Sequence, residues 1–403
     1  MPPKITEVQW GYSGRLPNGI SFKEETGTFS GTPTKVGEYT IPVTVWTNYG
    51  EDTKDVKIRV RTQGHEVYAV GNNYAKIWSG NTEPDEDGFY KLNIPKAVNL
   101  RELNGGFAAE TEMGDWYICG ERDYGVATNG QTQPVQVPFE NIIDIASSSA
   151  SNGSNPTYIV TLYLFSDNTC GKVDTNSDIY ERTSDTSALT AIIPNVIKIN
   201  SNGKVGYSKA IGGISKARLL FEGNKVGGDS VQSEQYAVDV GLSDKIIKTF
   251  LPREDISYFV TNNGELWQYT HYQNTPTLSQ VDFPYGTVKD AYTTAGNGCL
   301  SVATTGGELY AMGGNYNYQL GLPEAKNYTD LTKVGDYDVK KMSYLFMLTE
   351  SGELYYSGQN GISGIVSGTQ GYTRIFPNKK FKDIAFADGG LYHAKVLIAT
   401  IEE

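Results

Sequence analysis

The stretch that decides the fold reads Gly307-Glu308-Leu309-Tyr310-Ala311-Met312-Gly313-Gly314-Asn315. A Gly-Glu turn precedes a short apolar and aromatic run, and a Gly-Gly-Asn sequence follows it. This order is typical of a strand that leaves a hairpin and ends in a loop. Similar segments start at Val67, Trp116, Leu162, Leu219, Leu266 and Leu354, at intervals of 43 to 57 residues. Seven copies of a strand-rich unit at this spacing predict a seven-bladed β-propeller.

The copy at residues 307–322 continues into Gln319-Leu320-Gly321. It resembles the repeat of the regulator of chromosome condensation family, whose consensus is a GxLYxWGxNxxGQLG segment. Residues 352–368 and 65–73 are the next best copies, and the resemblance extends over residues 65–403. It implies a seven-bladed propeller but no single activity, because propellers of this family serve as exchange factors, inhibitors and adhesins.

The end of the chain predicts how the ring closes. Residues 381–386 and 393–400 supply two strands, but no further anchor segment follows them. We expect residues 65–71 to provide the missing strand, so that the first propeller strand completes the seventh blade. That pairing would remove the two sheet edges that an open ring exposes.

Residues 1–62 form a second predicted domain, separate from the propeller at 63–403. The segments Leu16-Pro17-Asn18-Gly19-Ile20-Ser21-Phe22, Thr26–Pro33 and Val36–Thr40 resemble the immunoglobulin-like modules of bacterial and phage surface proteins. A full immunoglobulin sandwich needs about seven strands and ~100 residues, and this segment has room for four or five. The overall prediction is an all-β chain, with a partial immunoglobulin-like sandwich that docks on the propeller or takes a strand from a partner.

Composition excludes several classes of function. A formal net charge of −12 disfavours a nucleic-acid phosphate track or an anionic membrane surface as partner. No apolar run approaches the ~18 residues that a membrane span requires, so we expect no membrane insertion. The three cysteines, Cys119, Cys170 and Cys299, are far apart and lack a CxxC pair, so we expect reduced thiols.

Catalytic patterns are few. His65, His271 and His393 lie in no metal-ligand spacing, and no nucleophile elbow or phosphate-binding loop occurs. The chain is therefore predicted to be no enzyme and to need no cofactor. One weak calcium candidate is Asp174-Thr175-Asn176-Ser177-Asp178, which has the D-x-N-x-D start of a calcium loop and Asp185 at the twelfth position. Ile179 replaces the required glycine, so a solvated acidic turn is the favoured interpretation.

Aromatic residues near the anchors suggest a recognition surface. Tyrosine adds contact area at low entropic cost, and the neighbouring asparagines adapt their hydrogen bonds. The candidate ligand-binding residues, expected in loops at one rim of the disc, are Tyr124, Tyr272, Tyr316, Tyr318 and Tyr372.

These features favour a non-enzymatic structural, decoration or adhesion protein of a bacteriophage virion, assembled in the host cytoplasm. In this hypothesis the immunoglobulin-like module anchors the protein to the virion. The propeller is displayed to bind other virion proteins or a host surface protein or glycan. Homo-oligomer formation through the module is a further expectation. Two alternatives stay open: a bacterial cell-surface or secreted binding protein, and an exchange factor or regulator of a small GTPase.

Overall fold

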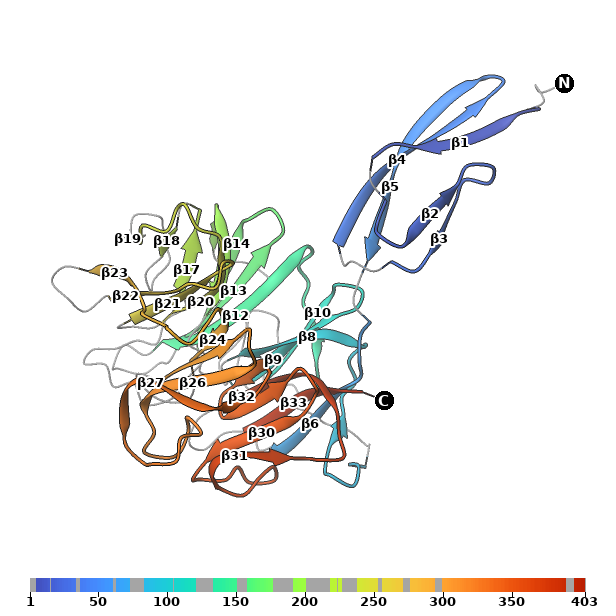
Figure 1. Cartoon of the computed structure of the whole chain (residues 1–403). Helices are drawn as coiled ribbons and strands as arrows, with labels where there is room; N and C mark the ends of the chain where they lie inside the picture. Colours follow the sequence, from blue (N-terminus) through green and yellow to red (C-terminus); the bar gives the residue numbers. More distant parts are fainter. Residues whose placement is uncertain are drawn as a thin grey trace. The chain divides into compact units, whose positions relative to one another are not determined.

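The computed structural model describes most of the chain, and the described part is all β (Figure 1). The described residues are 5–14, 16–33, 37–60, 63–72, 83–103, 105–120, 133–150, 158–176, 191–200, 218–222, 224–226, 238–252, 256–270, 276–293, 299–388 and 395–402. They contain no helix, and so none that could cross a membrane. The chain divides into two compact units, residues 1–63 and 64–403.

The first unit contains two small sheets. One has the order β1 (Val8–Tyr12), β4 (Gly37–Thr47) and β5 (Gly50–Val60), and the other is the hairpin of β2 (Ile20–Lys23) and β3 (Thr28–Gly31). The period of two along β4 buries Ile41 and Val43 on one face. Strands β2 and β3 form a hairpin in which Ser21 and Phe22 pair in register with Ser30 and Phe29. The unit thus has five strands, within the predicted four or five.

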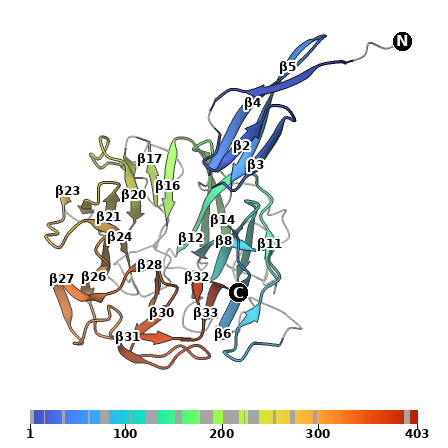
Figure 2. The same cartoon turned by 45° about the vertical axis from the view of Figure 1, so that its right-hand side comes forward.

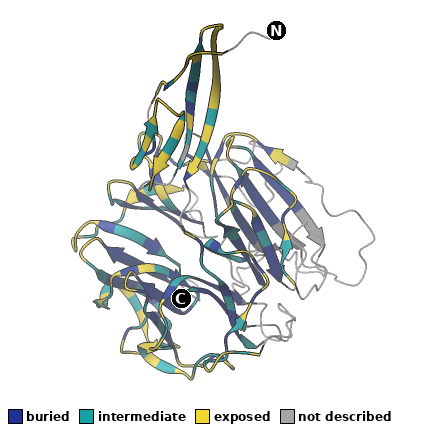
Figure 3. Ribbon diagram, turned by 90° about the vertical axis from the view of Figure 1, so that its right-hand side faces the viewer, coloured by how far each residue is buried: buried dark blue, intermediate teal, exposed yellow. Residues whose placement is uncertain are grey.

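The core of this unit is small. Among its described residues the buried apolar side chains are Ile41, Val43, Val60 and Pro17, and most of β5 is exposed (Figure 3). An aromatic group adds to it: Phe22 packs against Tyr12 and Phe29 with ring centroids 5.3 and 4.9 Å apart. Two sheets of three and two strands with so few buried side chains are marginal for independent folding.

We therefore expect a fragment of residues 1–62 to show no cooperative thermal transition. Ordering the backbone costs conformational entropy worth of order 1 kcal/mol per residue. The fragment buries too little apolar surface to offset that cost. Circular dichroism melting and NMR peak dispersion of the isolated fragment measure this. A sharp two-state melt with dispersed amide signals would contradict the expectation.

The second unit consists of seven four-stranded antiparallel sheets, the blades of a propeller. Blade 1 has β8 (Ala97–Leu103), β9 (Gly106–Thr111), β10 (Trp116–Gly120) and β11 (Val135–Gln136); blade 2 has β12 (Ile142–Ala150), β13 (Tyr158–Phe165), β14 (Cys170–Asn176) and β15 (Ala191–Ile193). Blade 3 has β16 (Val196–Asn200), β17 (Arg218–Phe221), β18 (Lys225–Val226) and β19 (Val238–Asp239); blade 4 has β20 (Ile247–Leu251), β21 (Ile256–Thr261), β22 (Leu266–Thr270) and β23 (Thr277–Gln280).

Three further blades complete the ring. Blade 5 has β24 (Val288–Tyr292), β25 (Leu300–Thr304), β26 (Glu308–Gly314) and β27 (Asn327–Asp336); blade 6 has β28 (Val339–Ser343), β29 (Phe346–Thr349), β30 (Leu354–Gly358) and β31 (Thr369–Ile375). Blade 7 has the order β32 (Phe381–Asp388), β33 (Lys395–Ile401), β6 (Val67–Asn72) and β7 (Tyr90–Lys91), so it joins both ends of the unit. The predicted number of blades is confirmed.

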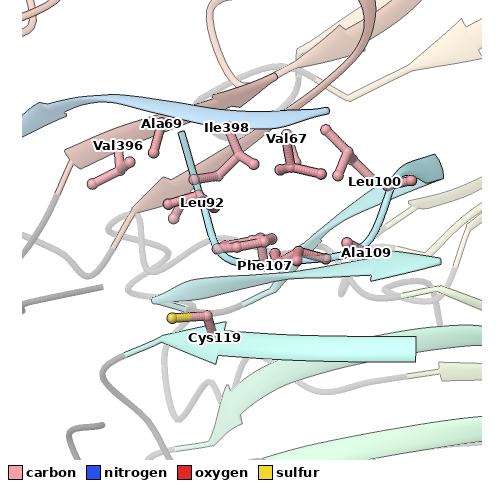
Figure 4. Close-up of a cluster of buried hydrophobic side chains, with 13 residues drawn as sticks. Val67, Ala69, Leu92, Leu100, Phe107, Ala109, Cys119, Val396 and Ile398 are labelled. Atoms are coloured by element: carbon pink, nitrogen blue, oxygen red, sulfur yellow. The ribbon is translucent and has the colours of Figure 1, made fainter. Parts of the chain in front are cut away.

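The predicted closure is also confirmed. Strand β33 pairs with β6 in a continuous antiparallel register from Lys395 opposite Asn72 to Thr400 opposite Val67. Behind this seam lies a cluster shared by blades 7 and 1, in which Ala69, Ile398 and Phe107 are fully buried (Figure 4). The ring is therefore held by backbone pairing and by a core that spans residues far apart in the sequence.

Two of the seven similar segments on which the repeat was aligned, here called the anchors, were matched to the wrong strand of their blade. Five of them lie on the third strand of a blade, but Leu162 and Leu219 lie on second strands, β13 and β17. In blades 1, 4, 5 and 6 a left-handed glycine such as Gly307 (φ 86°) forms the turn before the third strand. In blades 2 and 3 that turn uses Asn168 and Asn224 (φ 63° and 65°) instead. In these two blades the sequence pattern based on glycine turns therefore matched the second strand instead of the third. The number of blades is unaffected.

The cysteines agree with the prediction of reduced thiols. Cys119, Cys170 and Cys299 are free and buried. Burial raises the pKa of the Cys119 and Cys170 thiols to about 12. Both therefore stay protonated at neutral pH and act as small core side chains.

Candidate functional site: the axial channel

All seven innermost strands carry a β-bulge at the same place, one residue after they begin. In blade 2, for example, the pairing with β13 skips from Ile142 to Asp144, and the other six innermost strands repeat this break. The burial pattern repeats too: a buried apolar residue, an exposed or half-buried one, a half-buried polar one, and a buried apolar one. A bulge sets two successive residues of one strand opposite a single residue of its partner, so the same two positions stand out in every blade.

Two rings of side chains result. The polar ring is made of the half-buried residues, one from each blade: Asn99, Asp144, Lys198, Thr249, Asp290, Lys341 and Asp383. The mouth ring consists of the residues just before them: Val98, Ile143, Ile197, Lys248, Lys289, Lys340 and Lys382. We call the face of the disc at which the innermost strands begin the start face; the mouth ring lies there.

The polar ring lines an axial cavity of about 500 Å³. Its lining comes from the innermost strands of all seven blades, which surround the axis of the ring in Figure 2. An innermost strand has no neighbour on its axial edge, so its backbone N–H and C=O groups need other partners. Side chains of the two rings provide several of them.

The tightest part of this network joins blades 6, 7 and 1. Lys341 Nζ donates to Asp383 Oδ1 (2.7 Å) and to the carbonyl oxygen of Leu100 (2.6 Å), and the Leu100 N–H donates to Asp383 Oδ2 (2.6 Å). Ser343 Oγ donates to Glu102 Oε2 at 2.6 Å. Burial lowers the pKa of Lys341, and the Asp383 carboxylate opposes that effect. Three blades that meet here are thus tied by one carboxylate and one ammonium group.

The other channel carboxylates also have donors. Arg101 Nε lies 2.7 Å from Asp144 Oδ1, and Thr249 Oγ1 donates to Asp290 Oδ1 at 2.6 Å. Asp144 and Asp290 each accept a further hydrogen bond from the backbone N–H of the next residue. The negative charges of the channel are therefore bonded within the channel wall.

Lys198 differs from its neighbours in the polar ring. Among the described residues its ammonium group has no hydrogen-bond or ion-pair partner. Burial lowers its pKa, the Asp144 and Asp290 carboxylates raise it, and Arg101 lowers it further. The cavity lining as a whole contains six basic and four acidic side chains, although the chain has a net charge of −12. The channel is thus a positively charged cavity in an acidic protein.

Of the three histidines considered as possible metal ligands, His65 lies within the described residues, whereas His271 and His393 lie outside them. It forms a β-bridge with Ala97, in which each N–H donates to the other's carbonyl oxygen at 2.8 Å. Burial and the nearby Lys382 lower its pKa below 6.5. The folded state therefore takes up the proton less readily than the unfolded chain does.

We expect this histidine to make the propeller less stable in acid. Its stabilising contribution is complete above pH 6.5 and is lost as the pH falls from 6.5 through the lowered pKa of the folded state. The test compares the melting temperatures of wild type and His65→Gln at pH 7.5 and 5.5. The wild type should lose more than the variant on acidification, and an equal loss would contradict this prediction.

The rim tyrosines are only partly brought together. Tyr124 and Tyr272 lie outside the described residues. Tyr316 is 62% exposed, in the loop after β26. Tyr318 follows it with a left-handed φ of 57°, and its carbonyl oxygen accepts a hydrogen bond from Ser357 Oγ at 2.6 Å. This loop lies on the face opposite the start face, since β26 is the third antiparallel strand of its blade.

Tyr372 lies on the outer strand β31 and not in a loop. Its ring is half-buried and packs on Tyr337 at 5.8 Å between centroids, and a Cβ at Gly321 would come within 2.3 Å of it. Its hydroxyl is buried. The described contacts of Tyr372 are thus packing contacts that hold the 315–322 loop, and a ligand-binding role for these tyrosines stays a prediction.

That loop is fixed by a residue of the repeat consensus. Asn315 is fully buried and donates through Nδ2 to the carbonyl oxygens of Leu322 and Glu324, both at 2.8 Å. Its Oδ1 accepts from the Leu320 N–H at 2.9 Å. The asparagine therefore satisfies three backbone groups of the loop from the inside, which explains why the pattern requires it.

The calcium candidate is only partly described. Asp174 and Asn176 belong to strand β14, opposite Val160 and Tyr158, rather than to a loop. Asp178 and Asp185 lie outside the described residues. Within the described ranges no group of acidic, histidine or cysteine side chains is arranged to hold a metal ion, and calcium binding stays a prediction.

The polar ring was not predicted from the sequence, although a signal for it exists. The segments Ile142-Ile143-Asp144-Ile145, Val196-Ile197-Lys198-Ile199, Val288-Lys289-Asp290-Ala291 and Val339-Lys340-Lys341-Met342 share one pattern. It consists of two apolar residues that enclose one variable and one polar residue. Each copy resembles an ordinary short strand when taken alone, and its meaning depends on recurrence once in each blade.

Comparison with known proteins agrees with this architecture. Residues 4–61 match the family model described as "Putative Ig domain". The human WBSCR16 crystal structure has a TM-score of 0.58 and 12% identity, over 85% of this chain and 100% of that one. The structure of yeast RCC1 (Prp20) with Kap60 bound has a TM-score of 0.59 and 12% identity, over 85% of this chain and 90% of that one.

Prp20p from Saccharomyces cerevisiae, in a structure presented with its binding to Gsp1p and histones, gives a TM-score of 0.58 and 14% identity over 85% and 93% of the two chains. A search among curated proteins gives no match. The class is thus a seven-bladed propeller with the fold of RCC1-like proteins, preceded by an immunoglobulin-like segment. Identity this low establishes the fold only.

Proposed function

We propose that this protein is a non-enzymatic binding protein whose propeller is a rigid platform for another protein. The observation that supports this most is the closed ring of seven complete blades, which covers 90–100% of the two RCC1-like chains in their solved structures. The structures of yeast Prp20 include one with Kap60 bound and one described with Gsp1p and histones. In both cases the partners of Prp20 are proteins, which supports a protein partner for this chain as well.

Regulation of a small GTPase is the specific form of this proposal that the comparisons favour. The test measures release of a fluorescent GDP analogue from a panel of small GTPases, with and without the full chain. Accelerated release from one of them supports an exchange role. If the chain neither binds any GTPase of the panel nor changes its release rate, the regulator form of the proposal is wrong.

The solved structures named above give the virion role no support. That role draws on the immunoglobulin-like segment, whose family match covers residues 4–61. Display on a particle or a cell surface would use the same platform, so binding to another protein is the part that both hypotheses share.

A further inference from the structure

The mouth ring divides the start face into two arcs. Blades 1 to 3 contribute Val98, Ile143 and Ile197, and blades 4 to 7 contribute Lys248, Lys289, Lys340 and Lys382. Ile143 is 48% and Ile197 is 38% exposed, and Ile246, just before the innermost strand of blade 4, is 71% exposed. Single exposed apolar residues need no explanation, but here Ile143 and Ile197 directly precede the cavity-lining residues Asp144 and Lys198 on neighbouring blades, and Ile246 lies two residues before Lys248.

The four lysines of blades 4 to 7 form what we call the basic arc, and their positive charges are not equally neutralised. Lys289 Nζ forms ion pairs with Asp338 and Glu350, both at 2.8 Å, and Lys382 Nζ with Glu402 at 2.9 Å. Lys248 and Lys340 instead donate to backbone carbonyl oxygens, those of Lys289 and Lys382. Neither has a carboxylate at ion-pair distance among the described residues. Each keeps its positive charge and N–H groups that can serve a ligand.

Lys198 adds a third ammonium group inside the same cavity, one blade away from Lys248, that has no carboxylate at ion-pair distance among the described residues. Since the Asp144, Asp290 and Asp383 carboxylates are already hydrogen-bonded in the wall, the cavity lining has an excess of positive charge. Carboxylates on a ligand would give Lys198, Lys248 and Lys340 a counter-charge that none of the described residues provides at ion-pair distance, in a partly desolvated place where charge-assisted hydrogen bonds are strong.

We propose that the channel mouth binds an acidic peptide segment of a partner protein, with carboxylates on Lys198, Lys248 and Lys340 and an apolar side chain on Ile143 and Ile197. This inference rests on the proposed function, because it assigns the chemistry of the segment that a protein partner presents. Charge complementarity selects an acidic ligand, and the adjacent isoleucines select a polypeptide over a small anion. The residues of the site come from four blades, so only the closed ring forms it.

The test uses the full chain and a short fluorescein-labelled peptide of alternating glutamate and leucine, followed by fluorescence anisotropy. The wild type should bind the peptide, and Lys248→Met/Lys340→Met should bind it at least about tenfold more weakly. Ile197→Ser should weaken binding about threefold. Lys326→Met is the matched control: it removes one positive charge from an exposed site on the opposite face, and its affinity should equal that of the wild type.

Three outcomes of the peptide experiment would overturn the proposal. They are equal affinity of the double lysine variant and the wild type, equal binding of a peptide with glutamine in place of glutamate, and complete competition by inorganic phosphate at constant ionic strength. The last result would mean a simple anion site. Because the replaced side chains are exposed or half-exposed, circular dichroism should show unchanged folding. A small GTPase that binds wild type and the double lysine variant equally would leave the proposed function intact and exclude this site.

Discussion

The variant Ile398→Asp should lose at least about 4 kcal/mol of the free energy of unfolding of the propeller. Ile398 is fully buried in the cluster between blades 7 and 1, on strand β33 opposite Ala69. A carboxylate there has no cation within the apolar cluster, so it is either buried as a charge or forces the strand away. Either result breaks the β33–β6 pairing that joins the two ends of the ring.

Urea denaturation followed by tryptophan fluorescence measures this effect. The matched control is Met113→Asp, which introduces the same charge at a side chain that is 69% exposed on blade 1, and it should change stability by less than about 0.5 kcal/mol. If both variants unfold at the same urea concentration as the wild type, the seam does not carry the stability of the ring. That result would contradict the closure as described.

Asp383→Asn should destabilise the propeller by about 3 kcal/mol, the second largest effect we expect. The Asp383 side chain is only 13% exposed and that of Lys341 23%, so the substitution leaves an ammonium group in the wall without its counter-charge. It also weakens the bond from the Leu100 N–H to Asp383 Oδ2. Removing one partner of a buried pair costs more than replacing both.

The double variant Lys341→Met/Asp383→Asn therefore should recover about half of the loss, and a double-mutant cycle measures the coupling. The pH dependence gives a second measurement. Burial lowers the pKa of Lys341 below its ordinary 10.5, so the folded state favours the neutral amine and gains stability as the pH rises toward 10.5. The deficit of Asp383→Asn relative to the double variant should shrink over that range. A deficit that is independent of pH and additive in the cycle would refute the coupling.

Local patterns predicted most of the fold. The hairpin turns at Gly264, Gly307 and Gly352 and the apolar strands around them are properties of short segments, so seven units could be counted without coordinates. The errors were local as well. Asn168 and Asn224 take over the role of glycine in blades 2 and 3, so the pattern matched another strand there.

The site was harder to predict, because its members become neighbours only when the ring closes. Lys198 and Lys248 are fifty residues apart in the chain, and each lies in a segment that resembles any half-buried strand. The loops that contain the rim tyrosines were predicted to form a recognition surface, yet the described contacts of Tyr318 and Tyr372 are with other residues of the same chain.

The sequence by itself determined the number of blades, their antiparallel hairpins and the strand exchange between the two ends, because these follow from turn residues and from strands that lack a partner. Only the tertiary structure decided which polar side chains face the axis and which charges stay uncompensated. A side chain's surroundings in a propeller come from six other blades, and the electrostatic balance of the channel is a sum over all of them.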